Sequence, residues 1–81
     1  MLLHITQIHT PQTCTKNEGG IKALYKNVKG VKLLAIYGAF CEHITYYIVE
    51  AEDLELVYDF LEPGWLRCTS KITPVVQRPI E

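Results

Sequence analysis

The sequence has almost no excess of charge of either sign. Its 8 lysines and arginines nearly balance 9 aspartates and glutamates, and the formal net charge is −1. Proteins that attract nucleic acid carry a strongly positive surface, and RNA-recognition domains also stack bases on aromatic residues of their central strands. Only Tyr46 is suitably placed for such stacking. We therefore do not expect a nucleic-acid partner.

Long hydrophobic runs are also absent. The longest apolar stretch, residues 33–41, has about half the length of a membrane-spanning helix. The opening Met1-Leu2-Leu3 is interrupted by His4 and Gln7 and lacks the basic start of a signal peptide. We expect a cytoplasmic protein that is neither exported nor inserted into a membrane.

Closely spaced cysteines are missing as well. Cys14, Cys41 and Cys68 are odd in number and far apart, and none is separated from another by the two residues typical of redox and metal motifs. A disulfide framework is therefore not expected, and a reducing compartment fits better. Reduced thiols are inert core residues, metal ligands or redox groups, and their positions must decide among these.

What is present suffices for one small domain, residues 1–81. Apolar residues make up 48% of the chain and charged residues 21%, as in globular proteins. A domain of this size removes only about 60–65% of its unfolded surface from water, so its margin of stability is small. A further buried surface, such as a dimer interface, would enlarge that margin.

Four segments have the β-branched and aromatic composition of strands. The first is residues 2–9. The second, residues 31–40, is apolar at both alternating sets of positions, as in a strand covered on both faces. The third, residues 44–51, follows after a short connection and is expected to pair with the second as a hairpin. Pro74 predicts that the last, residues 67–76, lies at an edge of the sheet.

Two segments have helical periodicity, with apolar residues at i, i+3, i+4 and i+7. Asn17 can cap the first helix, which ends at Lys29-Gly30, and Glu52-Asp53 begin the second, which ends at Pro63-Gly64. The resulting β-α-β-β-α-β order predicts an α+β ferredoxin-like plait with sheet order 4-1-3-2 and both helices on one face. The apolar helix positions are Ile21, Leu24, Tyr25 and Val28, then Leu54, Val57, Tyr58 and Leu61.

This topology gathers reactive side chains at one edge of the sheet. The ends of the first two strands, the hairpin and the start of the last strand meet there, and with them His9, Cys14 and His43 from three separate segments. Imidazole and thiolate are ligands of zinc and copper, so these residues form a candidate metal site. A heavy-metal-carrier domain of the same element order holds its metal in the loop after the first strand, but its paired cysteines are absent here. Cys41, Glu42, Trp65 and Cys68 are expected at the same edge.

Ordinary packing is the alternative for these residues. Free cysteine is among the residue types most often buried, and Cys41 and Cys68 adjoin apolar strand residues, so packing is the favoured interpretation for both. His9 and His43 can make hydrogen bonds at strand ends without any metal. Cys14 lies in a polar loop and is the least easily explained by packing.

A second candidate site lies on the sheet face away from the helices. Alternation places His4 and Glu50 there, close together on neighbouring antiparallel strands, as an acid–base pair. Ile8, Tyr46 and Ile48 share this face and would leave an apolar patch in water unless a second copy covered it. We therefore expect a homodimer joined through its sheets. The barrel-like interior of such a dimer can hold a ligand. Alternatively, His4, Thr6 and Glu50 only form hydrogen bonds with one another where the two sheets meet.

The opening motif of the chain is distinctive. It reads His4-x-Thr6-x-x-His9-Thr10-Pro11-x-x-Cys14, and Glu42-His43, Tyr46-x-x-Val49-Glu50-Ala51 and Thr73-Pro74-Val75 follow later. With these motifs the chain resembles a small prokaryotic family of ferredoxin-like, dimeric α+β-barrel type, and it departs from that family's pattern at Gln7, Gln12 and Cys41. The resemblance implies the fold and a homodimer, and it implies no particular activity.

Three functions remain open on the sequence alone. The first is a dimeric small-ligand or metal-binding domain that uses His9, Cys14 and His43, with zinc or copper as the metal. The second is a cofactor-free enzyme of the small monooxygenase or isomerase type, with His4 and Glu50 as its acid–base pair inside the dimer barrel. The third is a purely structural assembly protein.

Overall fold

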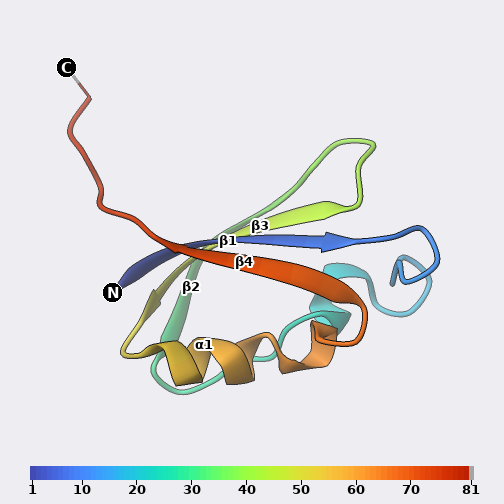
Figure 1. Ribbon diagram of the computed structural model, residues 1–81, viewed down its shortest axis with the longest axis horizontal. Helices are drawn as coiled ribbons and strands as arrows, with labels where there is room; N and C mark the ends of the chain where they lie inside the picture. Colours follow the sequence, from blue (N-terminus) through green and yellow to red (C-terminus); the bar gives the residue numbers. More distant parts are fainter. Residues whose placement is uncertain (81) are drawn as a thin grey trace.

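The computed structural model describes residues 1–80, which form one antiparallel sheet with helical elements on one of its faces (Figure 1). Four strands make the sheet, and one α-helix and two short 3₁₀ turns accompany it within these residues. The strands are β1 (Leu2–His9), β2 (Val31–Gly38), β3 (Ile44–Ala51) and β4 (Cys68–Pro74), and the helical elements are η1 (Gly20–Ala23), α1 (Leu54–Phe60) and η2 (Glu62–Gly64).

The strands lie in the order β2-β3-β1-β4, and all neighbours are antiparallel. The predicted β2–β3 hairpin is confirmed, and so is the edge position that Pro74 predicts for β4. Because β1 runs between β3 and β4, its last residue, His9, meets the beginning of both neighbours. The candidate metal residues lie at this edge of the sheet.

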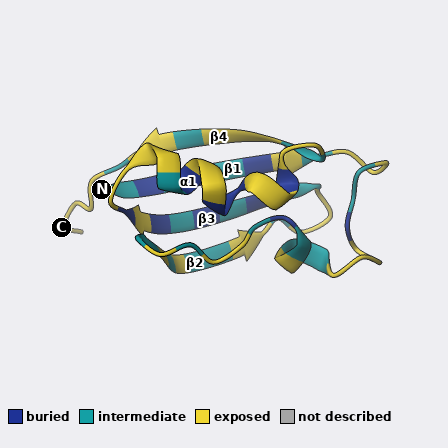
Figure 2. Cartoon of the chain, turned by 90° about the horizontal axis from the view of Figure 1, so that it is seen from below, coloured by how far each residue is buried: buried dark blue, intermediate teal, exposed yellow. Residues whose placement is uncertain are grey.

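Alternation along the two central strands divides the sheet into a covered face and an open face. Leu3 and Ile5 of β1 and Tyr47 and Val49 of β3 are all fully buried. Figure 2 shows α1 lying across buried segments of β1 and β3, and buried residues of α1 join the same core cluster. The helix begins after Asp53, whose carboxylate accepts a hydrogen bond from the backbone amide of Leu56 at 3.0 Å.

The opposite face of the sheet is open to solvent in a single chain. Tyr37 of β2, which lies opposite Tyr46 of β3, is 62% exposed, and Ile8 of β1 is 48% exposed. The prediction that β2 is covered on both faces is therefore wrong for one chain alone. The apolar residues of this face have no cover within residues 1–80.

The predicted ferredoxin-like plait is wrong, because the first of its two helices does not form. Its place is taken by the four-residue turn η1, followed by irregular chain up to β2. With a single α-helix in the described chain, the β-α-β-β-α-β arrangement with two helices on one face is not observed.

Glycine explains why this helix is missing. Gly19 and Gly20 have φ angles of +109° and +67°, outside the right-handed helical region, so an α-helix capped at Asn17 does not run through them. The remaining segment is short, and a short helix needs extensive packing to offset the cost of nucleation. The apolar pattern still reaches the core, since Leu24 is 1% exposed and Ile21 and Tyr25 pack against the buried cluster. The segment therefore supplies core side chains without forming a helix.

No helix among residues 1–80 is long and apolar enough to cross a membrane.

Candidate metal centre

Three separate segments bring the candidate metal ligands together. His9 is the last residue of β1, and His43 immediately precedes β3. The two strands are antiparallel neighbours, and the pairing continues beyond Ile8 and Ile44 because the backbone amide of His9 donates to the carbonyl of His43 at 3.0 Å. Cys14 approaches from the loop between β1 and η1. The sheet register thus fixes the two histidines, and a loop supplies the thiol.

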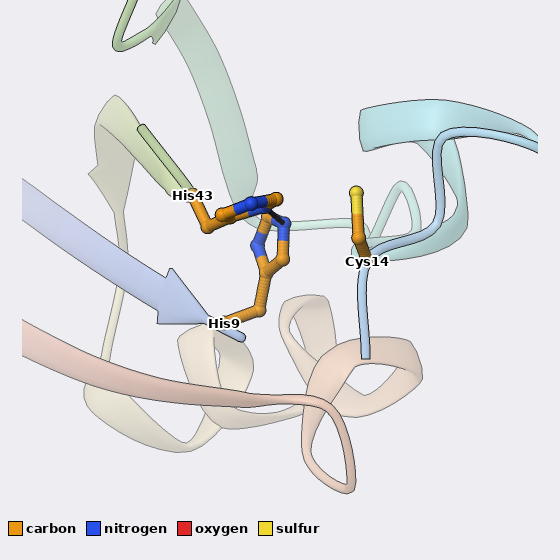
Figure 3. A group of neighbouring side chains, drawn as sticks. All are labelled: His9, Cys14 and His43. Carbon is orange, nitrogen blue, oxygen red and sulfur yellow. Dashed lines mark hydrogen bonds between the residues drawn. The ribbon is translucent and has the colours of Figure 1, made fainter. Parts of the chain in front are cut away.

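The side chains of these three residues converge on a small volume (Figure 3). Nδ1 of His43 lies 3.1 Å from Nε2 of His9, and the two rings meet edge to face with centroids 4.9 Å apart. One ligand atom from each residue, including Sγ of Cys14, lies within 4.8 Å of the others, and all three residues are half-buried. The structure therefore brings together all three residues that the sequence nominated for metal.

Two turns hold Cys14 beside the histidines. Before it, the backbone amide of Thr13 donates to the carbonyl of Thr10 at 3.1 Å, and their hydroxyl oxygens are 3.1 Å apart. After it, Thr15 is buried and donates its hydroxyl to the carbonyl of Gly20 at 2.6 Å. The position of the thiol is therefore defined by hydrogen bonds on both sides.

The surroundings of His9 favour its neutral form. Burial lowers the pKa of His9 below its ordinary value, and the neighbouring charge of His43 lowers it further. Nδ1 of His9 is buried without a hydrogen-bond partner in residues 1–80. We therefore assign its proton to Nε2, which donates to Nδ1 of His43, because a buried N–H without an acceptor would cost about 1–3 kcal/mol. His9 and His43 then share one proton between their facing nitrogens.

The spacing of the ligand atoms fits a tetrahedral ion. Bond lengths of about 2.0 Å to nitrogen and 2.3 Å to sulfur place two nitrogens about 3.3 Å apart and a nitrogen and a sulfur about 3.6 Å apart. The facing nitrogens at 3.1 Å already satisfy the first distance within a few tenths of an ångström. Since the thiol lies no more than 4.8 Å away, it needs to move by about 1 Å at most.

No family model, curated protein or solved structure matches this chain. The resemblance to the dimeric α+β-barrel family therefore stays a prediction, and no residue takes its role from a relative.

Two of the other residues expected at this edge also border the site. Cys41 and Glu42 line the same groove as the three candidate ligands, and this groove has a volume of about 490 Å³. Cys41 is exposed, so the packing interpretation is wrong for this cysteine. Its thiol lies outside the group of three converging ligand atoms.

Cys68 and Trp65 do not line this groove, although both border a neighbouring hollow that His9 also lines. Cys68 begins β4 opposite His9, and it lines a further hollow of about 290 Å³ together with Trp65 and Tyr58, whose ring centroids are 3.9 Å apart at a tilt of 44°. Burial raises the pKa of the Cys68 thiol. Half-buried and protonated at neutral pH, this thiol behaves as a packing residue.

The structure does not join the two residues of the second candidate site. His4 lies opposite Ile48 in the sheet register, and its ring centroid is 5.9 Å from that of Tyr46. The Glu50 carboxylate instead accepts a hydrogen bond from the amino group of Met1 at 2.8 Å. No hydrogen bond joins His4 to Glu50 within residues 1–80.

The residues that position the Cys14 loop were missed by the sequence analysis. Thr13 and Thr15 flank Cys14, and Arg67 donates to the backbone carbonyl of Thr13 at 3.4 Å and pairs with Glu18. The run of threonines after Pro11 was a usable signal, because threonine hydroxyls often hydrogen-bond to nearby backbone in turns. The Arg67 contact joins residues 54 positions apart and leaves no such local signal.

Proposed function

We propose that this chain is a metal-binding domain that holds a zinc or copper ion through His9, Cys14 and His43. One observation carries the proposal, namely that two imidazoles and one thiol from three segments place their ligand atoms within 4.8 Å of one another. The two histidines are 34 positions apart, so closeness in sequence does not explain the cluster.

The chemistry of the donors supports these metals. Thiolate and imidazole are preferred by zinc and copper, whereas magnesium and calcium require several oxygen ligands. A metal ion suits the site because one donor atom from each of the three residues lies within 4.8 Å of the others, in the groove that they line.

The energetics favour binding despite the buried Nδ1 atom of His9. Coordination through Nε2 of His9 moves its proton to Nδ1, where no acceptor lies within residues 1–80. Burying that N–H costs about 1–3 kcal/mol. Structural zinc contributes roughly 10–16 kcal/mol in small domains, so the cost is a minor part of the total.

A hydrogen-bonded histidine pair without metal is the competing explanation. The His9–His43 hydrogen bond accounts for the two imidazoles by itself. It does not account for Cys14, which offers its sulfur to the same point from a loop held by turns on both sides. The thiol is thus the residue whose replacement distinguishes the two explanations.

We also propose that the protein acts as a homodimer in the cytoplasm. The open sheet face, with Ile8 and Tyr37 exposed, is the surface that a second copy would cover. A reducing compartment keeps Cys14 available as a thiolate.

The proposal is tested by metal titration of the full chain without a histidine tag. Competition against a chromophoric chelator measures the affinity for Zn²⁺ and Cu⁺. Both His9→Ala and Cys14→Ala should weaken binding by more than about 100-fold, because each removes one of few ligands. His4→Ala and Cys68→Ala are matched controls of the same residue types outside the cluster and should bind as the wild type does. Equal binding by all four variants would refute the site.

A further inference from the structure

The loop between β2 and β3 contains an unusual backbone conformation at Cys41. Its φ angle is +62°, the left-handed region, and within residues 1–80 no other residue except glycine has a positive φ. This conformation costs roughly 1–2 kcal/mol for a residue with a Cβ, and turns normally place glycine or asparagine there. Cys41 is exposed, so burial of its side chain does not offset the strain.

Cys41 is also next to the candidate metal site. It lines the same groove as His9, Cys14 and His43, and it precedes His43 by two residues in one loop. That loop is fixed at its base, where the backbone amide of Ala39 donates to the carbonyl of Ile44 at 2.9 Å. The loop therefore carries one ligand residue, His43, to the site and places Cys41 in the wall of the same groove.

Three protein ligands leave one position of a tetrahedral ion unfilled. We propose that Cys41 fills this position, so that the chain binds metal as a closed His₂Cys₂ site of His9, Cys14, Cys41 and His43. The inference rests on the metal binding proposed above and extends it. Among the groove residues, Glu42 is the other candidate for the fourth ligand, and a thiolate is the softer donor that zinc and copper prefer.

A closed site has a structural role, because a catalytic zinc keeps one position for water or substrate. The ion joins the end of β1, the loop that carries Cys14 and the β2–β3 loop into one unit. This cross-link lies at the end of the sheet where the β1–β2 connection forms only a 3₁₀ turn. Metal binding thus stabilises a domain whose size leaves little margin.

The test uses Co²⁺ as a probe for zinc in the untagged full chain. Each thiolate bound to Co²⁺ adds to a near-ultraviolet charge-transfer absorption, so the intensity counts thiolate ligands. The wild type should show the intensity of two thiolates and the visible bands of a tetrahedral ion. Cys14→Ser and Cys41→Ser should each lose about half of the charge-transfer intensity, and Cys68→Ser should lose none.

The Cys41→Gly variant distinguishes the loss of a metal ligand from a loss of folding stability. Glycine relieves the left-handed strain, so the metal-free variant should be at least as stable to urea as the wild type and should still show half of the charge-transfer intensity. Alkylation followed by mass spectrometry gives a second readout: all three thiols should be modified in metal-free protein kept from air, and Zn²⁺ should protect Cys14 and Cys41 but not Cys68.

The outcomes separate this inference from the proposed function. If Cys41→Ser keeps the full intensity while Cys14→Ser abolishes it, the fourth-ligand assignment is overturned and the three-residue metal site stands. If Glu42→Gln removes the tetrahedral bands and Cys41→Ser does not, the fourth ligand is the carboxylate and the assignment is again overturned. If the wild type binds no Co²⁺, both proposals fail.

Discussion

His9 and His43 face each other across the ends of two antiparallel strands, with 3.1 Å between Nε2 of His9 and Nδ1 of His43. The backbone repeats this pairing, since the amide of His9 donates to the carbonyl of His43 at 3.0 Å. The imidazole pair is therefore fixed by the register of the sheet. Cys14 reaches the pair from a loop that is held by hydrogen-bonded turns on both sides.

The stability of the metal-free protein should depend on the protonation of His9. Burial and the nearby His43 lower the pKa of His9 below its ordinary value of 6.5. Between the folded and the unfolded pKa the unfolded chain binds more protons, so the free energy of unfolding should fall as the pH drops below about 6.5 and level off below the folded pKa. Urea denaturation at a series of pH values measures this slope. His9→Gln should reduce the slope, and an unchanged slope in that variant would contradict the lowered pKa.

The free energy of unfolding should depend on a buried hydrogen bond between two polar side chains on the covered face of the sheet. The Tyr47 hydroxyl donates to Oε1 of Gln7 at 2.7 Å, and both side chains are fully buried. Tyr47→Phe leaves the Gln7 carbonyl without that donor and should destabilise the protein by about 1–3 kcal/mol in urea denaturation. In the double variant Gln7→Leu/Tyr47→Phe the loss should be smaller than the sum of the two single losses. Strictly additive losses would show that the hydrogen bond contributes nothing.

Strand positions could be predicted from the sequence because strands depend on local alternation. Leu3 and Ile5 are buried and His4 faces the other way, as a period of two requires. The first helix could not be predicted correctly, because Ile21, Leu24 and Tyr25 have helical spacing in a segment that folds as a 3₁₀ turn. The spacing of apolar residues predicts which side chains reach the core. Here the two glycines with positive φ angles determine that the backbone does not continue as an α-helix.

The candidate metal site was predictable in part, because it depends on which strand ends meet. Antiparallel neighbours at β1 and β3 suffice to place His9 beside His43, even though the helical layer was predicted wrongly. The predicted His4–Glu50 pair is not hydrogen-bonded within residues 1–80, because alternation assigns a residue to a face of the sheet but does not set the register between strands, and Glu50 lies opposite Leu2. The left-handed backbone of Cys41 has no sequence signal, since turns normally place glycine or asparagine there.

The open sheet face leads to a prediction about assembly. Ile48 lies on this face in a central strand, opposite His4. A lysine there would place a charge in the sheet-to-sheet interface, so Ile48→Lys should give a soluble monomer or aggregate in analytical ultracentrifugation. Leu54→Lys is the matched control, because Leu54 is 52% exposed on the helix and lies away from this face. A wild-type chain that stays monomeric at high concentration would rule out the dimer.

Metal content is the measurement that tests the central claim most directly. The full chain, expressed without a histidine tag and purified without chelator, should contain or take up one Zn²⁺ or copper ion per chain near neutral pH. Binding should weaken steeply below about pH 6, because protons compete with the metal for the imidazoles of His9 and His43 and for the thiolate of Cys14. Elemental analysis gives the metal content per chain, and metal titration near neutral pH and again below about pH 6 gives the change in affinity. A wild-type protein that binds neither zinc nor copper at micromolar metal would contradict the account.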